Sequence, residues 1–160
     1  MKSKKILNRG FTLLELLVVV AIIGILSAVV VSALNSARNK GGDAAVQANL
    51  KNAISQGEIF YGTNAVAINT YTNVCTNGVV GGANGVGAFV LAAAKANGLV
   101  SYDIDPVSPG GTLTTATCND SASAWAAEVP LKYMSGMWCV DSAGVSRQET
   151  TSILTGTACN

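Results

Sequence analysis

The sequence predicts an α+β fold: a long N-terminal helix, with a membrane-spanning half and an amphipathic half, packed on a small antiparallel β-sheet head. Three observations predict this fold. Residues 16–34 carry no charged side chain, a helical stripe of apolar residues follows them, and short strand-like runs between turn residues fill the C-terminal third. The 160 residues suffice for one compact domain with an appendage but not for two full-sized domains.

The run 16–34 is long enough to cross a membrane, because as a helix it spans about 28 Å. Four of the ten cationic side chains precede it, namely Lys2, Lys4, Lys5 and Arg9. Cationic residues before a span stay in the cytoplasm, so we expect the chain after Leu34 on the far side of the membrane. A cleaved secretory signal, with Val31-Ser32-Ala33 as the cut site, and a plain single-span anchor are the alternative interpretations.

The helical pattern resumes after Arg38 and Lys40. Seven residues at offsets 0, 4, 7, 8, 11, 14 and 15 share one helical face: Val46, Leu50, Ala53, Ile54, Gly57, Phe60 and Tyr61. We expect this face to pack on the sheet. The pair Gly41-Gly42 weakens the helix by about 1 kcal/mol per glycine and marks a candidate hinge.

The remaining segments predict a loop, a short helix and strands. Residues 62–87 are rich in Asn, Thr and Gly and predict a loop. Residues 84–97 predict a short helix that ends at Gly98, with an inner face of Phe89, Ala92, Ala93 and Ala96. Strands are expected at residues 113–117, 124–129, 137–140 and 152–154, with Trp125 and Trp138 as cross-strand partners in the core.

The composition narrows the possible chemistry. Histidine is absent, which excludes imidazole-dependent triads and histidine metal sites, and a net charge of +1 gives no overall footprint for nucleic acid. We therefore expect no enzyme, no cofactor, no metal and no direct nucleic acid binding. Asp103 and Asp105, with Asp120 or Asp141, offer oxygen ligands for calcium, but their spacing fits no complete calcium loop, and solvated turn residues are the preferred interpretation.

The four cysteines all lie in the part expected to be exported. An even count on the oxidising side of a membrane indicates two disulfides, and the absence of a Cys-x-x-Cys pattern argues against zinc. Three pairings are possible among Cys75, Cys118, Cys139 and Cys159.

Glu15 is unusual because it places a carboxylate at the start of an apolar helix that contains no cation. A cut between Gly10 and Phe11 would create an α-amino group four residues away. The segment Gly10-Phe11-Thr12-Leu13-Leu14-Glu15, between a short basic leader and the apolar run, resembles the class III signal of type IV pilins and type II secretion pseudopilins. The resemblance covers about residues 4–30.

The resemblance implies a role for each matching residue. Gly10 corresponds to the residue before the scissile bond, Phe11 to the new and N-methylated terminus, and Glu15 to the carboxylate that pairs with a neighbour's terminal amine. It divides the chain into a leader (1–10), an apolar membrane and assembly helix (11–37) and an extracytoplasmic head (38–160). It also favours the pairs Cys75–Cys118 and Cys139–Cys159, because pilins often tie the C-terminal segment to the sheet. Ser32 stands where many pilins have a helix-bending proline, which leaves melting near Gly24 open.

The function implied is that of a structural subunit of a type IV pilus-like filament. The expected partners are further copies of the chain, a prepilin peptidase and methyltransferase, the pilus assembly platform, and the inner membrane before assembly. We expect a single-pass precursor in the inner membrane with a cytoplasmic N-terminus, and an extracellular pilus after assembly. The alternatives are a pseudopilin or minor pilin of a secretion or DNA-uptake apparatus, and a monomeric membrane-anchored adhesin.

Overall fold

The computed structural model describes residues 10–65, 68–76, 79–80, 83–99, 102–103 and 112–160. These residues form an α+β arrangement in which a long N-terminal helix packs against an antiparallel sheet. The chain divides into two compact units, one ending at Ala37 and the other running from Arg38 to Asn160. We call the second unit the head. The basic leader residues Lys2, Lys4, Lys5 and Arg9 lie outside the described residues.

Helix α1 (Leu13–Thr63) contributes the predicted stripe to the core of the head. Five of the seven residues are buried, namely Val46, Leu50, Ala53, Gly57 and Phe60. The other two, Ile54 and Tyr61, are partly buried and pack against the core. The prediction of this face is confirmed. Helix α1 is continuous through Gly41-Gly42, and the candidate hinge there stays a prediction. Gly42 allows a close approach, since a Cβ at this position would lie 2.5 Å from Oδ1 of Asn97.

Turns and a short hairpin connect α1 to a second helix. The hairpin pairs β1 (Val79–Val80) with β2 (Ala83–Asn84), and helix α2 (Gly87–Ala96) follows. The helix ends in a Schellman motif, in which the amides of Gly98 and Leu99 donate to Lys95 O and Ala94 O, both at 2.9 Å. Gly98 has a φ of +66°, which explains why glycine occupies this end.

Half of the predicted inner face of α2 is confirmed, since Ala93 is buried and Phe89 packs partly buried against the core. Its buried residues are Gly87, Val90, Ala93 and Ala94, whereas Ala92 and Ala96 are exposed. The helix is short and rich in alanine, so its sequence pattern does not distinguish one face from the next. Val90 is fully buried, and Phe89 is partly buried and packs against the core.

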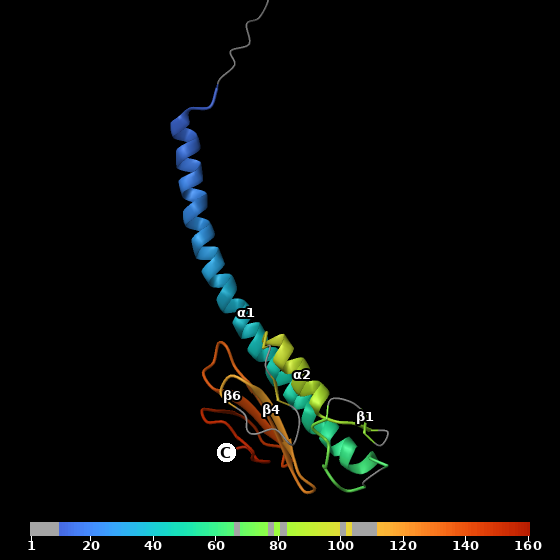
Figure 1. The fold of residues 1–160 in the computed structure, drawn as a ribbon. Coiled ribbons are helices and arrows are strands. Elements are labelled where there is room, and N and C mark those ends of the chain that lie inside the picture. Colours follow the sequence, from blue (N-terminus) through green and yellow to red (C-terminus); the bar gives the residue numbers. More distant parts are fainter. Residues whose placement is uncertain (1–9, 66–67, 77–78, 81–82, 100–101, 104–111) are drawn as a thin grey trace, which may run out of the picture. The chain divides into compact units, whose positions relative to one another are not determined.

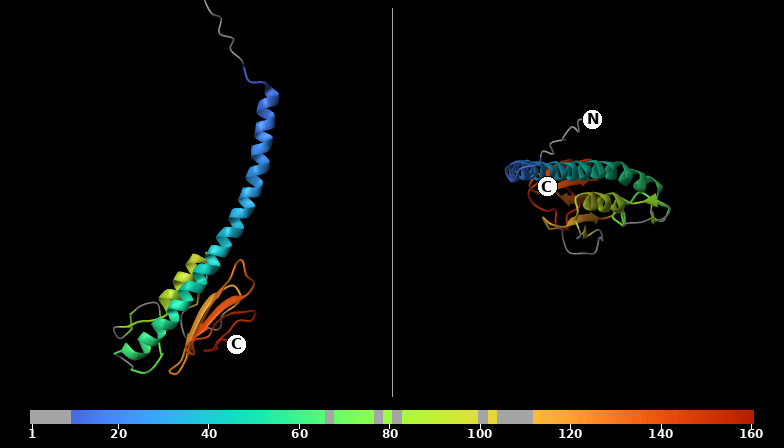
Figure 2. Two further views of the ribbon diagram at one scale, coloured as in Figure 1. Left: turned by 180° about the vertical axis from the view of Figure 1, so that it is seen from behind. Right: turned by 90° about the horizontal axis from the view of Figure 1, so that it is seen from above.

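A five-stranded sheet completes the head. Its order is β3-β4-β5-β6-β7, with β3 (Tyr102–Asp103), β4 (Ala116–Asp120), β5 (Trp125–Pro130), β6 (Met137–Asp141) and β7 (Ser146–Glu149). Strands β4 to β7 form an antiparallel meander, and β3 lies parallel to β4 at the edge, where the sequence predicts only antiparallel pairing. Within the head, α2 and α1 cover the same face of the sheet (Figures 1 and 2).

Two expected strands are misplaced. The strand predicted at 113–117 begins only at Ala116, because the hydroxyl of Thr112 bonds Thr114 and Thr115 in a turn. Residues 152–154 form no strand, and the last strand is β7. Three of the four β7 residues are exposed, so it lacks the apolar alternation that indicates a strand.

The core lies between α1, α2 and the inner face of the sheet. Trp125 is fully buried against Gly57, where an added Cβ would lie 2.7 Å from its Nε1. The register pairs Trp138 with Val129, so the two tryptophans are not cross-strand partners and that prediction is wrong. Trp138 is partly buried, and its Nε1 donates to Ser146 Oγ at 3.2 Å.

Candidate functional site

The N-terminal motif forms the cap of α1. Thr12 precedes the first helical residue, and its Oγ1 accepts a hydrogen bond from the amide of Glu15 at 3.2 Å. In return, Oε2 of Glu15 accepts from the amide and the hydroxyl of Thr12, both at 2.9 Å. This reciprocal arrangement is a capping box, and it places the carboxylate where the helix dipole favours a negative charge.

Gly10 and Phe11 lie just before this cap. Both residues are exposed and non-helical, with Phe11 84% exposed and open space around the Cα of Gly10. Exposed, irregular backbone is the kind of segment that proteases cleave. The bond between Gly10 and Phe11 lies in such backbone, and the cut there stays a prediction.

The following part of α1 presents an apolar surface on every side. All the large apolar side chains from Phe11 to Leu34 are exposed. The most apolar window has a mean hydropathy of 3.0 and no buried residue, so α1 is long and apolar enough to cross a membrane. The helix is unbroken at both Gly24 and Ser32.

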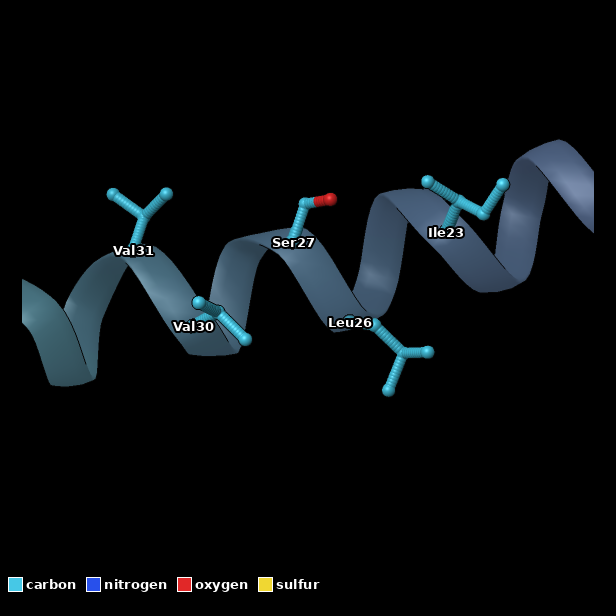
Figure 3. A pocket seen from close by; sticks show the side chains of 5 residues that line it. All are labelled: Ile23, Leu26, Ser27, Val30 and Val31. Carbon is cyan, nitrogen blue, oxygen red and sulfur yellow. The ribbon is translucent and has the colours of Figure 1, made fainter.

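A shallow notch of about 320 Å³ marks this apolar surface. Figure 3 shows its lining side chains on two rows of one helix, Ile23, Ser27 and Val31 on one row and Leu26 and Val30 on the other. Since the small Ser27 lies between larger residues, the notch is a groove that the ridge of another helix can fill.

Asp43 ties α1 to the loop between β5 and β6. Its side chain is 2% exposed and accepts three backbone hydrogen bonds, from Lys132 at 2.7 Å and from Tyr133 and Met134 at 2.8 Å. The side-chain amide of Asn97 donates to the same carboxylate at 3.4 Å and to Pro130 O at 2.7 Å. The carboxylate thus joins α1, the end of α2 and the sheet at one point.

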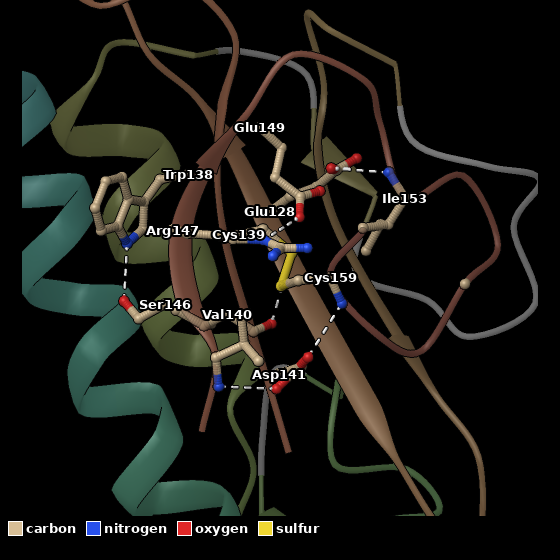
Figure 4. The surroundings of a disulfide bond; sticks show 12 residues. Glu128, Trp138, Cys139, Val140, Asp141, Ser146, Arg147, Glu149, Ile153 and Cys159 are labelled. Atoms are coloured by element: carbon tan, nitrogen blue, oxygen red, sulfur yellow. Dashed lines mark hydrogen bonds and ion pairs between the residues drawn. A yellow bond between two sulfur atoms is a disulfide. The ribbon is translucent and has the colours of Figure 1, made fainter. Parts of the chain in front are cut away.

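Two disulfides close the head. The structure pairs Cys75 with Cys118 and Cys139 with Cys159, which are 43 and 20 residues apart in sequence. These are the pairs that the family resemblance favours. Figure 4 shows Cys159 reaching the sheet face opposite the helices, where it meets Cys139 on β6.

The C-terminal segment covers this outer face of the sheet through polar contacts. Fully buried Glu128 accepts from the hydroxyl of Ser152 and from the amide of Ile153 at 3.0 Å. Burial raises the pKa of Glu128 above its ordinary value. Asp141 Oδ2 accepts from the amide of Cys159 at 3.1 Å, which fixes the last turn of the chain.

The acidic side chains in the described head serve the fold. Asp120 accepts from the amide of Cys75 at 2.9 Å, and Asp141 accepts from the amides of Ala143 and Val145 at 3.0 Å. Asp105 lies outside the described residues. Of the calcium ligands considered from the sequence, Asp120 and Asp141 are therefore bonded to backbone amides.

A second metal-like group of side chains comprises Cys139, Glu149 and Cys159, whose ligand atoms lie within 4.8 Å of one another. Both sulfur atoms belong to a disulfide, and Oε1 of Glu149 is paired with Nε of Arg147 at 3.0 Å. The oxidised head therefore offers a metal no thiolate at this position.

Sequence reasoning missed three residues that organise these regions. Thr12 was detectable, because Thr-x-x-Glu before an apolar run is the pattern of a capping box. Asp43 and Glu128 carried no such signal, since their partners are backbone amides up to 91 and 25 residues away in sequence.

Comparisons with known proteins agree with this geometry. The family model described as the prokaryotic N-terminal methylation motif matches residues 7–31. The chain is 43% identical over 65 residues to the type IV wide pilus major component PilA4 of Thermus thermophilus. That match covers 41% of this chain and 47% of the relative, so it spans about half the relative's length. No solved structure shows a significant match.

The region matched by the family model contains the capping box and the beginning of the apolar surface. A long apolar helix packed against an antiparallel sheet is a pilin-like arrangement. The methylation motif, this arrangement and the Thermus relative together support the assignment of the chain to the type IV pilin superfamily, as a pilin-like subunit.

Proposed function

We propose that the chain is a structural subunit of a type IV pilus-like filament, made as a membrane-anchored precursor, cleaved after Gly10 and polymerised by packing of residues 11–37. One observation carries the proposal. From Leu16 to Leu34, α1 has exposed apolar side chains on all sides, although it belongs to a chain whose head has its own core. A helix apolar on all sides is stable only inside lipid or protein, so this part needs a partner from outside the chain.

Processing creates the second feature needed for assembly. A prepilin peptidase and methyltransferase would remove residues 1–10 and leave a methylated, cationic amine on Phe11. That amine lies beside the Thr12–Glu15 capping box, at the membrane end of the subunit. A carboxylate in lipid is costly without a counter-ion, and the amine of an adjacent copy supplies one.

Assembly would follow from repeating one contact. The assembly platform brings a new subunit to the base of the fibre, where its apolar helix packs against those of earlier copies. The groove at Ser27 suits such packing, because small residues let helices approach closely. A head-to-tail contact of this type does not close on itself, so its repetition yields a helical filament. The proposal is structural and includes no enzymatic activity.

The test separates the charge of Glu15 from its role in the helix cap. Glu15→Gln keeps a capping-box oxygen and removes the charge, Glu15→Ala removes both, and Thr12→Val removes the cap hydroxyl and keeps the charge. We expect both Glu15 variants to be processed but to lower filament yield by about tenfold or more, with a smaller loss for Thr12→Val. Filaments are counted in sheared surface material by electron microscopy and immunoblotting.

Glu58→Gln is the matched control, because it makes the same chemical change on α1 but in the head, where Glu58 accepts a hydrogen bond from Tyr71. It should leave the filament yield unchanged. Normal processing with an undiminished yield for Glu15→Gln would contradict the proposed charge pairing. A trace amount of the chain in abundant filaments would instead indicate a minor subunit.

A further inference from the structure

The head gathers its cationic side chains at one end. Four of its six Lys and Arg residues lie on three segments that meet near Gly42, where the end of α2 approaches α1. They are Arg38 and Lys40 on α1, Lys95 in the last turn of α2, and Lys132 in the loop between β5 and β6. All four are exposed. We call these four residues the basic end of the head.

The carboxylates described near the basic end are buried. Asp43 is buried, and its oxygens accept the amides of Lys132, Tyr133 and Met134. Glu149, at the end of β7 that pairs with Met137, is buried and bonded to Arg147. The exposed charge at this end among the described residues is therefore positive.

Tyr133 adds an aromatic side chain to this surface. The Nζ of Lys40 lies 4.5 Å from the centre of the Tyr133 ring, which is part of a side chain 53% exposed. On the other side of the loop, the Nζ of Lys132 would lie 3.0 Å from a Cβ built on Gly98. Tyrosine is enriched where a membrane meets water, and a lysine near the end of a membrane helix can extend its ammonium group to that interface.

Two residues of the basic end follow the membrane segment closely in sequence. Arg38 and Lys40 follow Leu34, the end of the charge-free run, by four and six residues, or about 6 and 9 Å of helical rise. A headgroup layer adds about 5–7 Å to each side of the hydrocarbon core. If residues 16–34 fill that core, both side chains reach the phosphate groups.

We propose that the basic end of the head, together with Tyr133, binds the phosphate headgroups of the membrane and holds the head on the bilayer surface before assembly. This inference rests on the proposed function, because it requires an anchored precursor. Asp43 is the positioning residue, since its three hydrogen bonds fix the loop that carries Lys132 and Tyr133. Lipid is favoured over another copy because Arg38 and Lys40 follow the charge-free run by only four and six residues.

The experiment measures lysine acetylation in the full-length precursor. The chain is placed in nanodiscs with one copy per disc, made either of phosphatidylcholine or of phosphatidylcholine with one quarter phosphatidylglycerol. Mass spectrometry follows acetylation of each lysine by a water-soluble acetylating reagent. Anionic lipid should slow the reaction at Lys40 and Lys132 by about threefold to fivefold at about 0.1 M salt, and about 1 M salt should abolish the difference.

Lys51 is the internal control. It is exposed on the same helix, roughly 16 Å of helical rise beyond Lys40 and farther than the screening length of about 10 Å at 0.1 M salt. Its rate should be the same in both lipids. In Asp43→Asn, Lys132 should lose its protection while Lys40 keeps it. Lys40→Gln should reduce the protection of Lys132, and Lys51→Gln should not.

Equal rates for Lys40 and Lys132 in the two lipids would overturn the inference. Protection that requires two or more copies per disc would also overturn it, because the contact would then be between copies. Either result leaves the proposed function intact if the Glu15 variants behave as expected. A precursor that does not insert into discs at all would overturn both.

Discussion

The two parts of helix α1 differ in where their apolar side chains find partners. Beyond Arg38, the stripe from Val46 to Phe60 is buried against α2 and the sheet of the same chain. From Phe11 to Leu34, the large apolar side chains are exposed. One continuous helix therefore combines a segment that completes its own domain with a segment that does not.

The difference shows how one secondary-structure element can serve two environments. Beyond Arg38 the sequence is amphipathic, and the burial of one face stabilises the head. Before it, apolar residues occupy every side, so burial must come from lipid or from other copies. Both parts are helical, and they differ in how polar residues are distributed around the helix axis.

The largest effect is expected from a substitution that damages the core of the head. Trp125→Ala removes a fully buried indole that packs on Gly57, and we expect a loss of about 3–5 kcal/mol in the free energy of unfolding. Urea unfolding of the full chain in mild detergent, followed by near-ultraviolet circular dichroism, measures it. Trp138→Ala, at a partly buried position, is the control and should lose less.

The apolar part of α1 should not respond to this change. Hydrogen exchange of residues 13–34 in detergent should be the same in Trp125→Ala and in the unmodified chain. If exchange accelerates there as much as in the head, the two parts are not independent and the comparison fails.

Removal of the C-terminal disulfide tests how the outer sheet face is closed. The double change Cys139→Ser and Cys159→Ser opens a 20-residue loop, and we expect a loss of about 3 kcal/mol. Hydrogen exchange should rise most at Ile153, whose amide donates to Glu128. Unchanged exchange at Ile153 would mean that the polar contacts alone hold the segment.

Substitution of Asp43 tests the junction between α1 and the loop between β5 and β6, at the start of the head. Asp43→Ala leaves three backbone amides without their acceptor, and we expect a loss of about 2–3 kcal/mol. Asp43→Asn keeps one acceptor oxygen and should lose less. Urea unfolding compares the two variants, and equal stability of Asp43→Ala and the unmodified chain would show that the junction does not depend on this carboxylate.

The smallest expected effect is on the pH dependence of stability, which the buried Glu128 should influence. Burial raises its pKa in the folded head, so its contribution to stability is fully present below the pKa of the unfolded chain and is lost as pH rises through the folded pKa. Stability should therefore fall from acidic toward neutral pH, and Glu128→Gln should flatten that fall. Thermal unfolding at a series of pH values measures this fall in stability. Identical pH profiles for Glu128→Gln and the unmodified chain would contradict the raised pKa of Glu128.

The sequence predicts best where a pattern is regular and closes locally. The stripe of α1 was predictable because seven apolar residues follow the helical period, and the end of α2 because Gly98 is a typical helix terminator. Strand β7 was not, because an exposed edge strand needs no apolar alternation. The register that separates Trp125 from Trp138 depends on loop lengths that residue types do not reveal.

The candidate site was predictable for a different reason. Gly10, Phe11 and Glu15 were identified through a family resemblance in consecutive residues, and their roles in cleavage, methylation and assembly remain predictions. Asp43 was not predictable, since its partners are amides of a loop that folding alone brings to α1. Local motifs are visible in the sequence, whereas contacts made with distant backbone are not.

The most direct test of the central claim is the mass of the mature chain in assembled surface material. If the apolar part of α1 is retained as the assembly surface, intact-mass spectrometry should show a chain that begins at Phe11, with one added methyl group and two disulfides. A chain that begins at Met1 would contradict the proposed processing. One that begins near Leu34 would show that residues 11–33 are a removed signal, and that the exposed apolar helix plays no part in the mature protein.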